Sequence, residues 1–479
     1  MIFYSIDYVL FLSVVFILYW FLVSKNLKAQ NILLLFVGYV FYASWGYQFL
    51  FLLVFSTLFN FFIGIKINDA QELGKKRLWF YVGVFINVGI LAIFKFSSVW
   101  LDRILEILPA LMANTNGSLM VTVIAPIGIS FYTFCGLAYI ADVFQKKITP
   151  SRDYVEYAVF ISFFPAIISG PIERASHLLP QIRRVREFEY DKAVDGLEQI
   201  LWGLLKKLVI ADGCAEYVNM IFSNSADYSG STLVLGAIFF SFQIYADFSG
   251  YSDIALGTAR LLGIDLLQNF AFPYFSRDIA EFWRRWHISL SSWFRDYVFY
   301  PLERRRIPLL GQGVNTIIVF LLTGLWHGAN WTYIVWGSLN AVYFLWFLFI
   351  SKSRNTSGIV AQGKYLPSGK DIFNMGITFG LTTFAWIFFR AEDLTKAFAY
   401  ISGIFSWSIF SAPEIFSIKM LMLIFVFITI EWLGREQKYA LANFAANWPR
   451  PLRWFLYYAL VFAVFYFSGT QQEFIYSQF

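Results

Sequence analysis

The chain has three histidines, and one of them lies where an ionisable side chain is unexpected. His327 stands between an apolar run from Ile317 to Leu322 and another from Trp331 to Ile350. Apolar stretches of this combined length are typical of a bilayer, so we expect the imidazole within or close to the hydrocarbon. Ionisable side chains are costly there and usually serve a function. His327 is therefore the first catalytic candidate.

The second histidine, His287, lies in the arginine- and tryptophan-rich segment Asp278–Tyr300. If this segment is one helix, Arg284, His287, Ser291 and Arg295 share a stripe, because they are three, four and four residues apart. The stripe would form a cationic wall that carries a histidine. The alternative is an interfacial amphipathic helix whose arginines reach lipid head groups.

Two imidazoles in a membrane cavity suit acyl transfer. A hydroxyl must lose its proton as it attacks a thioester, and a neutral imidazole accepts that proton near physiological pH. A second imidazole could bind the thioester or the developing oxyanion, or set the tautomer of the first. No metal site is expected, since no spacing such as HExxH occurs. His177 follows a polar stretch, and we expect it in surface or loop structure.

The composition excludes an ordinary soluble enzyme. Of 479 residues, 58% are hydrophobic and 14% are charged, against about 25% charged in soluble domains. We expect an all-α, multi-pass protein of the lipid bilayer. The net charge of +6 comes from basic residues between apolar runs, where they act as topology determinants and do not indicate nucleic-acid binding. Cys135 and Cys214 are expected to be small buried hydrophobes.

About twelve membrane crossings are expected from the apolar runs, together with broken or re-entrant helices. The segment 155–171 is the strongest re-entrant candidate, because Pro165, Gly170 and Pro171 favour a helix break. The runs are Tyr8–Val23, Asn31–Trp45, Phe49–Ile65, Trp79–Phe96, Leu119–Ile140, Tyr154–Ser169, Ser231–Ala246, Asn315–Leu325, Trp331–Ile350, Ile372–Phe389, Met420–Trp432 and Trp454–Phe467.

The chain is expected to form a single membrane domain over residues 1–479. Its core spans about 80–350, followed by C-terminal helices at 371–467 and an aromatic tail at 468–479. Ser351–Lys370 is expected to be a surface loop. Basic residues follow the first span and precede the last one, so both termini are expected outside.

Two carboxylates, Asp247 and Asp253, lie in an otherwise apolar stretch and need partners there. We expect an arginine of the segment 277–295 to pair with them. This pairing would also help to position the residues of the site.

Six segments carry a resemblance to a known family. Together they resemble the membrane-bound O-acyltransferase superfamily, and most closely its alginate O-acetylation branch, over nearly the whole chain. They are PIGISFYTF (126–134), FFPAIISGPIER (163–174), YADFSGYSDIALG (245–257), NFAFPYFSRDIAEFWRRWHISLSSWFRDYVFYPL (269–302), TGLWHGANWTYIVWG (323–337) and AWIFFRAED (385–393).

The resemblance implies a ring of helices around a funnel, with His327 as catalytic residue and His287 as second active-site residue. It implies acetyl-CoA from the cytoplasm as the acyl-donor substrate, and no bound cofactor. It also implies the bacterial cytoplasmic (inner) membrane, and a periplasmic or extracellular SGNH-type acetyltransferase or esterase as partner. The product would be an O-acetylated cell-envelope or extracellular polysaccharide, such as alginate or peptidoglycan.

The arginines then gain an interpretation. Arg284, Arg285 and Arg295 are expected to hold the phosphates of CoA through charge-assisted bonds. Arg304–Arg306 could do the same, although simple positive-inside charge is favoured for them. Further substrate-binding candidates in the two histidine motifs are Ser291, Trp326 and Asn330.

The C-terminal tail ends in an unusually aromatic sequence, QQEFIYSQF. One interpretation is an interfacial anchor. The other is that the tail folds back into the outer mouth and offers the Tyr476 hydroxyl as an acyl relay, because CoA itself cannot cross the membrane. Related acyl-export systems use tyrosine-bearing C-termini in this way.

Two other classes of function stay open. The same fold could transfer D-alanine to teichoic acid, or a long acyl chain to lipid or protein. A transporter or flippase would also have broken helices and polar groups at the midplane.

Overall fold

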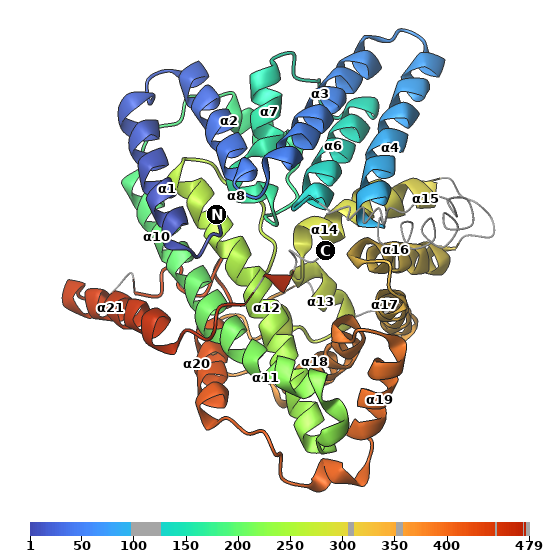
Figure 1. The fold of residues 1–479 in the computed structure, drawn as a ribbon, viewed down its shortest axis with the longest axis vertical. Coiled ribbons are helices and arrows are strands. Elements are labelled where there is room, and N and C mark those ends of the chain that lie inside the picture. Colours follow the sequence, from blue (N-terminus) through green and yellow to red (C-terminus); the bar gives the residue numbers. More distant parts are fainter. Residues whose placement is uncertain (97–125, 305–310, 351–357, 446–447, 473, 476–479) are drawn as a thin grey trace, which may run out of the picture. The chain divides into compact units, whose positions relative to one another are not determined.

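The computed structural model describes residues 1–96, 126–304, 311–350, 358–445, 448–472 and 474–475. Every regular element within these ranges is a helix, so the predicted all-α fold is confirmed. The chain forms two compact units, one of Met1–Phe188 with Leu262–Leu266 and one of Glu189–Leu261 with Leu267–Gln478. Figure 1 shows their helices.

The first unit is built on apolar helices whose contact surfaces carry a few polar pairs. Asn60 of α3 and Asn87 of α4 exchange amide hydrogen bonds of 3.0 and 2.8 Å, which satisfies both groups in apolar surroundings. The helices are α1 (Ile6–Ile17), η1 (Leu18–Leu22), α2 (Leu27–Ala43), α3 (Tyr47–Asp69), α4 (Leu73–Lys95), α6 (Ile129–Phe144), α7 (Tyr154–Ser162), α8 (Phe164–Ile167) and α9 (Ala175–Ile182).

The predicted break within 155–171 is present. Helix α7 ends at Ser162 and α8 begins at Phe164. Pro165 lies in the first turn of α8, where its missing N–H would have no helical partner in any case. That the segment re-enters the membrane stays a prediction.

The second unit holds both candidate catalytic histidines. Its elements are α10 (Tyr190–Leu205), η2 (Lys206–Ala211), α11 (Asp212–Ser223), η3 (Ser225–Asp227), α12 (Gly230–Leu261), η4 (Pro273–Phe275), α13 (Ile279–Arg285), α14 (Ile288–Phe294), η5 (Arg295–Phe299), α15 (Tyr300–Arg304), α16 (Gln312–His327), α17 (Trp331–Ile350), α18 (Gly369–Arg390), α19 (Leu394–Ile404), η6 (Trp407–Phe410), α20 (Ile418–Gly434) and α21 (Arg450–Phe467).

Helix α12 is the centre of this unit, and every residue from Phe239 to Ala259 is buried. Helix α10 packs along it at glycines. A Cβ on Gly203 would lie 2.6 Å from the carbonyl oxygen of Gly250, and one on Gly257 would lie 2.4 Å from that of Gly196. Side chains larger than hydrogen would force these backbones apart.

The structure supports a multi-pass membrane protein. Among the described residues, five helices are long and apolar enough to cross a bilayer, namely α3, α4, α12, α17 and α18. Three shorter apolar stretches occur there at Ile6–Leu22, Leu27–Ala43 and Ile129–Phe144. The predicted span Ser231–Ala246 was too short. Helix α12 continues to Leu261 because partners within the protein satisfy the polar side chains of its second half.

Most described residues of Ser351–Lys370 are exposed, as expected for a surface loop, but one part of the segment is anchored. In its described part, Val360 is fully buried. Arg435 donates hydrogen bonds of 3.0 and 2.7 Å to the carbonyl oxygens of Val360 and Ala361. These hydrogen bonds connect the segment before α18 to the end of α20.

We expect Gly257→Ala to lower the melting temperature of the detergent-purified protein. Tryptophan fluorescence measures the unfolding. The new methyl group would overlap the Gly196 carbonyl, at a cost of about 1–3 kcal/mol. Gly376→Ala in α18 is the matched control, because its Cβ would meet nothing within 4 Å. A Gly257→Ala protein as stable as the wild type would contradict the close packing of α10 on α12.

Candidate active site

His287 occupies a tight break between α13 and α14. Its backbone has a φ of 42°, in the left-handed region that costs a non-glycine residue about 1–3 kcal/mol. Asn269 holds this break. Its carbonyl oxygen accepts the Ile288 N–H at 2.9 Å, and its side-chain oxygen accepts the Ser289 hydroxyl at 2.6 Å. The imidazole is thereby held inside the protein, with His287 only 1% exposed.

The predicted stripe of Arg284, His287, Ser291 and Arg295 is wrong. It assumed one continuous helix, and the left-handed His287 separates two short helices instead. Arg284 and Arg295 are exposed. The Ser291 hydroxyl donates to the carbonyl oxygen of Trp286 at 3.2 Å. That these residues bind substrate stays a prediction.

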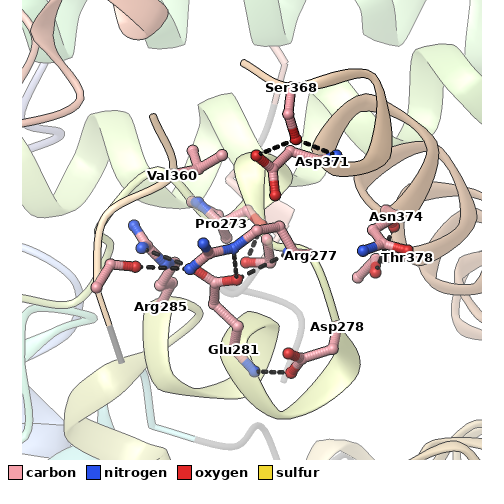
Figure 2. A network of polar contacts seen from close by, with 12 residues as sticks. Pro273, Arg277, Asp278, Glu281, Arg285, Val360, Ser368, Asp371, Asn374 and Thr378 are labelled. Carbon is pink, nitrogen blue, oxygen red and sulfur yellow. Dashed lines mark hydrogen bonds and ion pairs between the residues drawn. The ribbon is translucent and has the colours of Figure 1, made fainter. Parts of the chain in front are cut away.

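Arg285 belongs to a polar network that fixes α13. Figure 2 shows that Arg277 and Arg285 both bind Glu281, with nitrogen to oxygen distances of 2.9 and 2.8 Å. The Asp278 carboxylate accepts the backbone N–H of Glu281 at 2.7 Å and so caps the helix. Arg285 therefore already has a buried anionic partner, with which a CoA phosphate would compete.

His327 is the last residue of α16 and is 3% exposed. Helices α16 and α17 approach closely at Gly324, where a Cβ would lie 2.4 Å from the carbonyl oxygen of Tyr333. The imidazole is enclosed by aromatic rings, with centroid distances of 5.1 Å to Trp336 and 4.9 Å to Phe389. The glycines of this motif thus allow a tight hairpin that places His327 among aromatic side chains.

The two buried histidines both lie next to the ring of Trp326. The Trp326 ring centroid lies 6.2 Å from that of His287 and 4.7 Å from that of His327. On its other side His287 contacts Phe248, at 4.6 Å and 85°. Residues 40 positions apart in sequence are thus brought into one aromatic cluster. That both rings face one substrate cavity stays a prediction.

Asn330 links the His327 turn to the end of α18. Its side-chain oxygen accepts the N–H of Thr332 at 3.1 Å, and its amide nitrogen donates to the carbonyl oxygen of Glu392 at 2.6 Å. Its observed role is thus to position the turn, and substrate binding by Asn330 stays a prediction.

A partly open cavity, with ≈ 330 Å³ of empty space that includes open solvent, adjoins the His287 break. Its lining includes Lys206, Tyr245, Asp253 and Asn269. Asn269 thus borders the cavity and also holds the turn that carries His287. Sequence analysis had given Asn269 no role, although a polar residue within the motif NFAFPYF was a signal.

The predicted pairing of Asp247 and Asp253 with an arginine is wrong. Lys207 lies 2.8 Å from both Asp247 and Asp212, and Lys206 pairs with Asp253. Lys207, Asp212 and Asp247 have side chains that are at most 2% exposed. The missed signal was the pair of lysines within the apolar run ILWGLLKKLVIA, because such charges need partners.

A local change in helix geometry brings Lys207 and Asp212 together. Lys206–Ala211 form a π-helix, in which hydrogen bonds join residues five apart instead of four. Lys207 and Asp212 have this spacing, so their side chains meet on one face. In a regular α-helix, side chains five residues apart point to different sides of the helix.

The C-terminal tail forms hydrogen bonds with Asp247 and Lys207 of this charged cluster. The Ile475 N–H donates to the Asp247 carboxylate at 2.8 Å, and the carbonyl oxygen of Gln472 accepts from Lys207 at 3.1 Å. Phe474 is buried and stacks on Tyr251 at 4.6 Å. The interfacial-anchor interpretation is therefore wrong for this part of the tail. Tyr476 lies outside the described residues.

The third histidine, His177, was expected in surface or loop structure. It lies in helix α9 of the first unit, not in a loop, and its side chain is 34% exposed. Its Nδ1 is 2.8 Å from a carboxylate oxygen of Glu173. This hydrogen bond raises the pKa of His177. Cys135 and Cys214 are both buried free cysteines, as predicted.

Comparison with known proteins identifies the class. The family model described as MBOAT, membrane-bound O-acyltransferase family, matches residues 143–390, which include both buried histidines. A probable alginate O-acetylase of Azotobacter vinelandii is 35% identical over 419 residues, which cover 86% of this chain and 81% of the relative. The chain is thus a multi-pass membrane O-acyltransferase, and it belongs to the MBOAT family.

Two further relatives act on other cell-envelope polymers, according to their names. The peptidoglycan O-acetyltransferase of Helicobacter pylori is 33% identical over 406 residues, which cover 79% of this chain and 74% of that protein. The teichoic acid D-alanyltransferase of Bacillus subtilis is 30% identical over 281 residues, with 56% and 69% covered.

Lys207→Met should destabilise the protein by about 3–5 kcal/mol, because it leaves two buried carboxylates without their cation. Lys75→Met is the control, since Lys75 forms only an exposed pair with Glu72. Thermal unfolding in detergent measures both variants. Equal stability of the two would mean that the Lys207 cluster contributes little to the fold.

Proposed function

We propose that the chain takes acetyl from cytoplasmic acetyl-CoA and passes it across the bacterial cytoplasmic (inner) membrane for O-acetylation of an extracytoplasmic polysaccharide. The contact of His287 and His327 with the same Trp326 ring is the observation that carries this proposal. It brings two proton-transferring groups together in a buried aromatic cluster, where charge interactions are stronger than in water.

In the proposed reaction His327 is the general base. Its imidazole takes the proton of an attacking hydroxyl while the oxygen bonds to the thioester carbonyl carbon. The C–S bond then breaks, and the CoA thiolate receives a proton from the imidazolium. His287 binds the thioester oxygen as negative charge develops on it. The strained backbone at His287 supports a functional role for that position.

Arg304 and His327 lie near opposite ends of α16. The Glu303 carboxylate accepts from Asn315 in the first turn of α16 at 2.9 Å, so the neighbouring Arg304 lies near the start of that helix. His327 ends α16, which has 16 residues and a length of about 24 Å. In this proposal Arg304 lies towards the cytoplasm, as positive-inside charge predicts, and His327 faces the outward acceptor.

The proposed first acceptor is the Tyr476 hydroxyl. The backbone of the preceding residue, Ile475, is bound to Asp247. Phe474 contacts Phe248, whose ring contacts His287. The tail thus approaches the histidine cluster at Phe474, two residues before the tyrosine. An acetyl-tyrosine would present the acyl group to a separate SGNH-type partner outside.

The relatives also include a D-alanyltransferase, but the match to the probable alginate O-acetylase covers more of this chain, 86% against 56%. Acetyl is therefore the favoured cargo.

His327→Ala should lower the release of CoA thiol from labelled acetyl-CoA by about 10²–10⁴-fold, because general-base catalysis is lost. The assay uses purified protein and measures thiol and protein-bound label. His177→Ala is the matched control and should keep wild-type activity, since this histidine pairs with Glu173. Unchanged thiol release in His327→Ala would remove the assignment.

Tyr476→Phe should abolish acetyl label on the protein, because the phenyl ring lacks the nucleophilic oxygen. Tyr466→Phe, in the exposed last turn of α21, is the control and should keep the label. Mass spectrometry locates the acetyl group. The relay is wrong if cell-envelope acetylation stays at the wild-type level in Tyr476→Phe.

A further inference from the structure

An arginine in an open cleft lacks an acidic hydrogen-bond partner. Arg390 ends α18, and its guanidinium donates to the side-chain oxygen of Asn219 at 3.0 Å. It also lies over the Phe222 ring, 5.5 Å from the centroid. Across the described ranges of the chain, the neutral Asn219 is the one hydrogen-bond partner of Arg390. A guanidinium has five N–H donors in a fork that matches a carboxylate.

The cleft around this guanidinium has ≈ 350 Å³ of empty space, which includes open solvent. Lys396 at the edge of the cleft pairs with Glu392. The residues that line the cleft include two cations, Arg390 and Lys396, and one acidic group, Glu392, so the lining carries one net positive charge. This excess suits one carboxylate. The lining includes Phe222, Ser223, Ser225, Arg390, Lys396 and Tyr400.

Positive-inside charge predicts that the cleft lies at the outward end of the second unit. Helix α18 has 22 residues and is about 33 Å long. The segment before its start is bound by Arg435, which belongs to the basic stretch expected on the cytoplasmic side. Arg390, at the other end, therefore faces outward.

The cleft is also connected to both parts of the candidate active site. Phe389, the neighbour of Arg390, contacts the His327 ring at 4.9 Å. Asn219, which binds Arg390, donates to the Gln472 side chain of the C-terminal tail at 3.3 Å. A ligand on Arg390 would therefore act on groups next to the catalytic histidine and the tail.

We propose that this cleft is the docking site for an acidic side chain of the extracytoplasmic partner protein, with Arg390 as its anchor. The inference rests on the proposed function for the existence of that partner. Helix α19, which supplies Lys396 and Tyr400, leads to the strongly exposed aromatic residues Phe405, Trp407 and Phe410. Arginine, tryptophan and phenylalanine are enriched at protein–protein interfaces.

A sugar carboxylate fits this cleft less well than a protein side chain. The Phe222 ring is already stacked on Tyr400, at 4.4 Å and 20°, and covered by Arg390. No free aromatic face therefore remains at Phe222 for a sugar ring to stack on. The carboxylate alone can be recognised, as in an aspartate or glutamate side chain.

The test measures binding of a fluorescent acidic peptide, (Gly-Glu)₃, to the detergent-purified full chain at low salt and without acetyl-CoA. The neutral peptide (Gly-Gln)₃ should not bind. Arg390→Gln should weaken binding of the acidic peptide at least about tenfold, the loss expected when one charge-assisted bond is removed. Lys396→Gln should also weaken binding of the acidic peptide, and its exposed position means little risk to folding. Arg77→Gln, at an exposed cation of the first unit, is the control and should bind normally.

His327→Ala should bind the acidic peptide as the wild type does, so a failure of the acyl chemistry is distinguishable from a failure of this site. Absence of peptide binding, or equal binding by the wild type and both cleft variants, would overturn the proposal. Binding of an oligogalacturonate that depends on Arg390, without peptide binding, would overturn it in favour of a sugar site.

Discussion

The second unit depends on one buried ammonium group. Lys207 binds Asp212 and Asp247, and the three side chains are almost completely shielded from water. Each charge would be very costly alone, so the cluster is stable only while all partners are present. It joins η2 to α11 and α12. Through Asp247 it also holds the backbone of Ile475. One electrostatic constraint therefore determines both the helix packing and the path of the C-terminal tail.

The aromatic cluster adds the second constraint, which is steric. His287 and His327 come from separate helix ends and contact the same Trp326 ring. Neither imidazole is positioned by its own helix alone. Asn269 holds the strained break at His287, and the glycine at 324 allows the hairpin that ends in His327. Tight backbone approaches, together with one amide side chain, thus set the distance between the two histidines.

The sequence predicted much of the fold and the identity of the two buried histidines. It could not predict the ion-pair partners. The prediction paired Asp247 with an arginine of 277–295, where the nearest cations in the sequence motifs lie. The observed partner is Lys207, in a segment that received no role. The prediction also treated 278–300 as one helix, and a periodic pattern cannot reveal a single left-handed residue such as His287.

The sequence by itself determined what had to be buried. Its apolar runs specify helices in a bilayer, and its few charges within those runs must be neutralised because hydrocarbon does not solvate them. Only the tertiary structure decided which groups do so. The π-helical turn at Lys206–Ala211 moves side chains five residues apart onto one face, and the aromatic contacts join helix ends distant in sequence. Both depend on packing between segments, which local residue spacing does not encode.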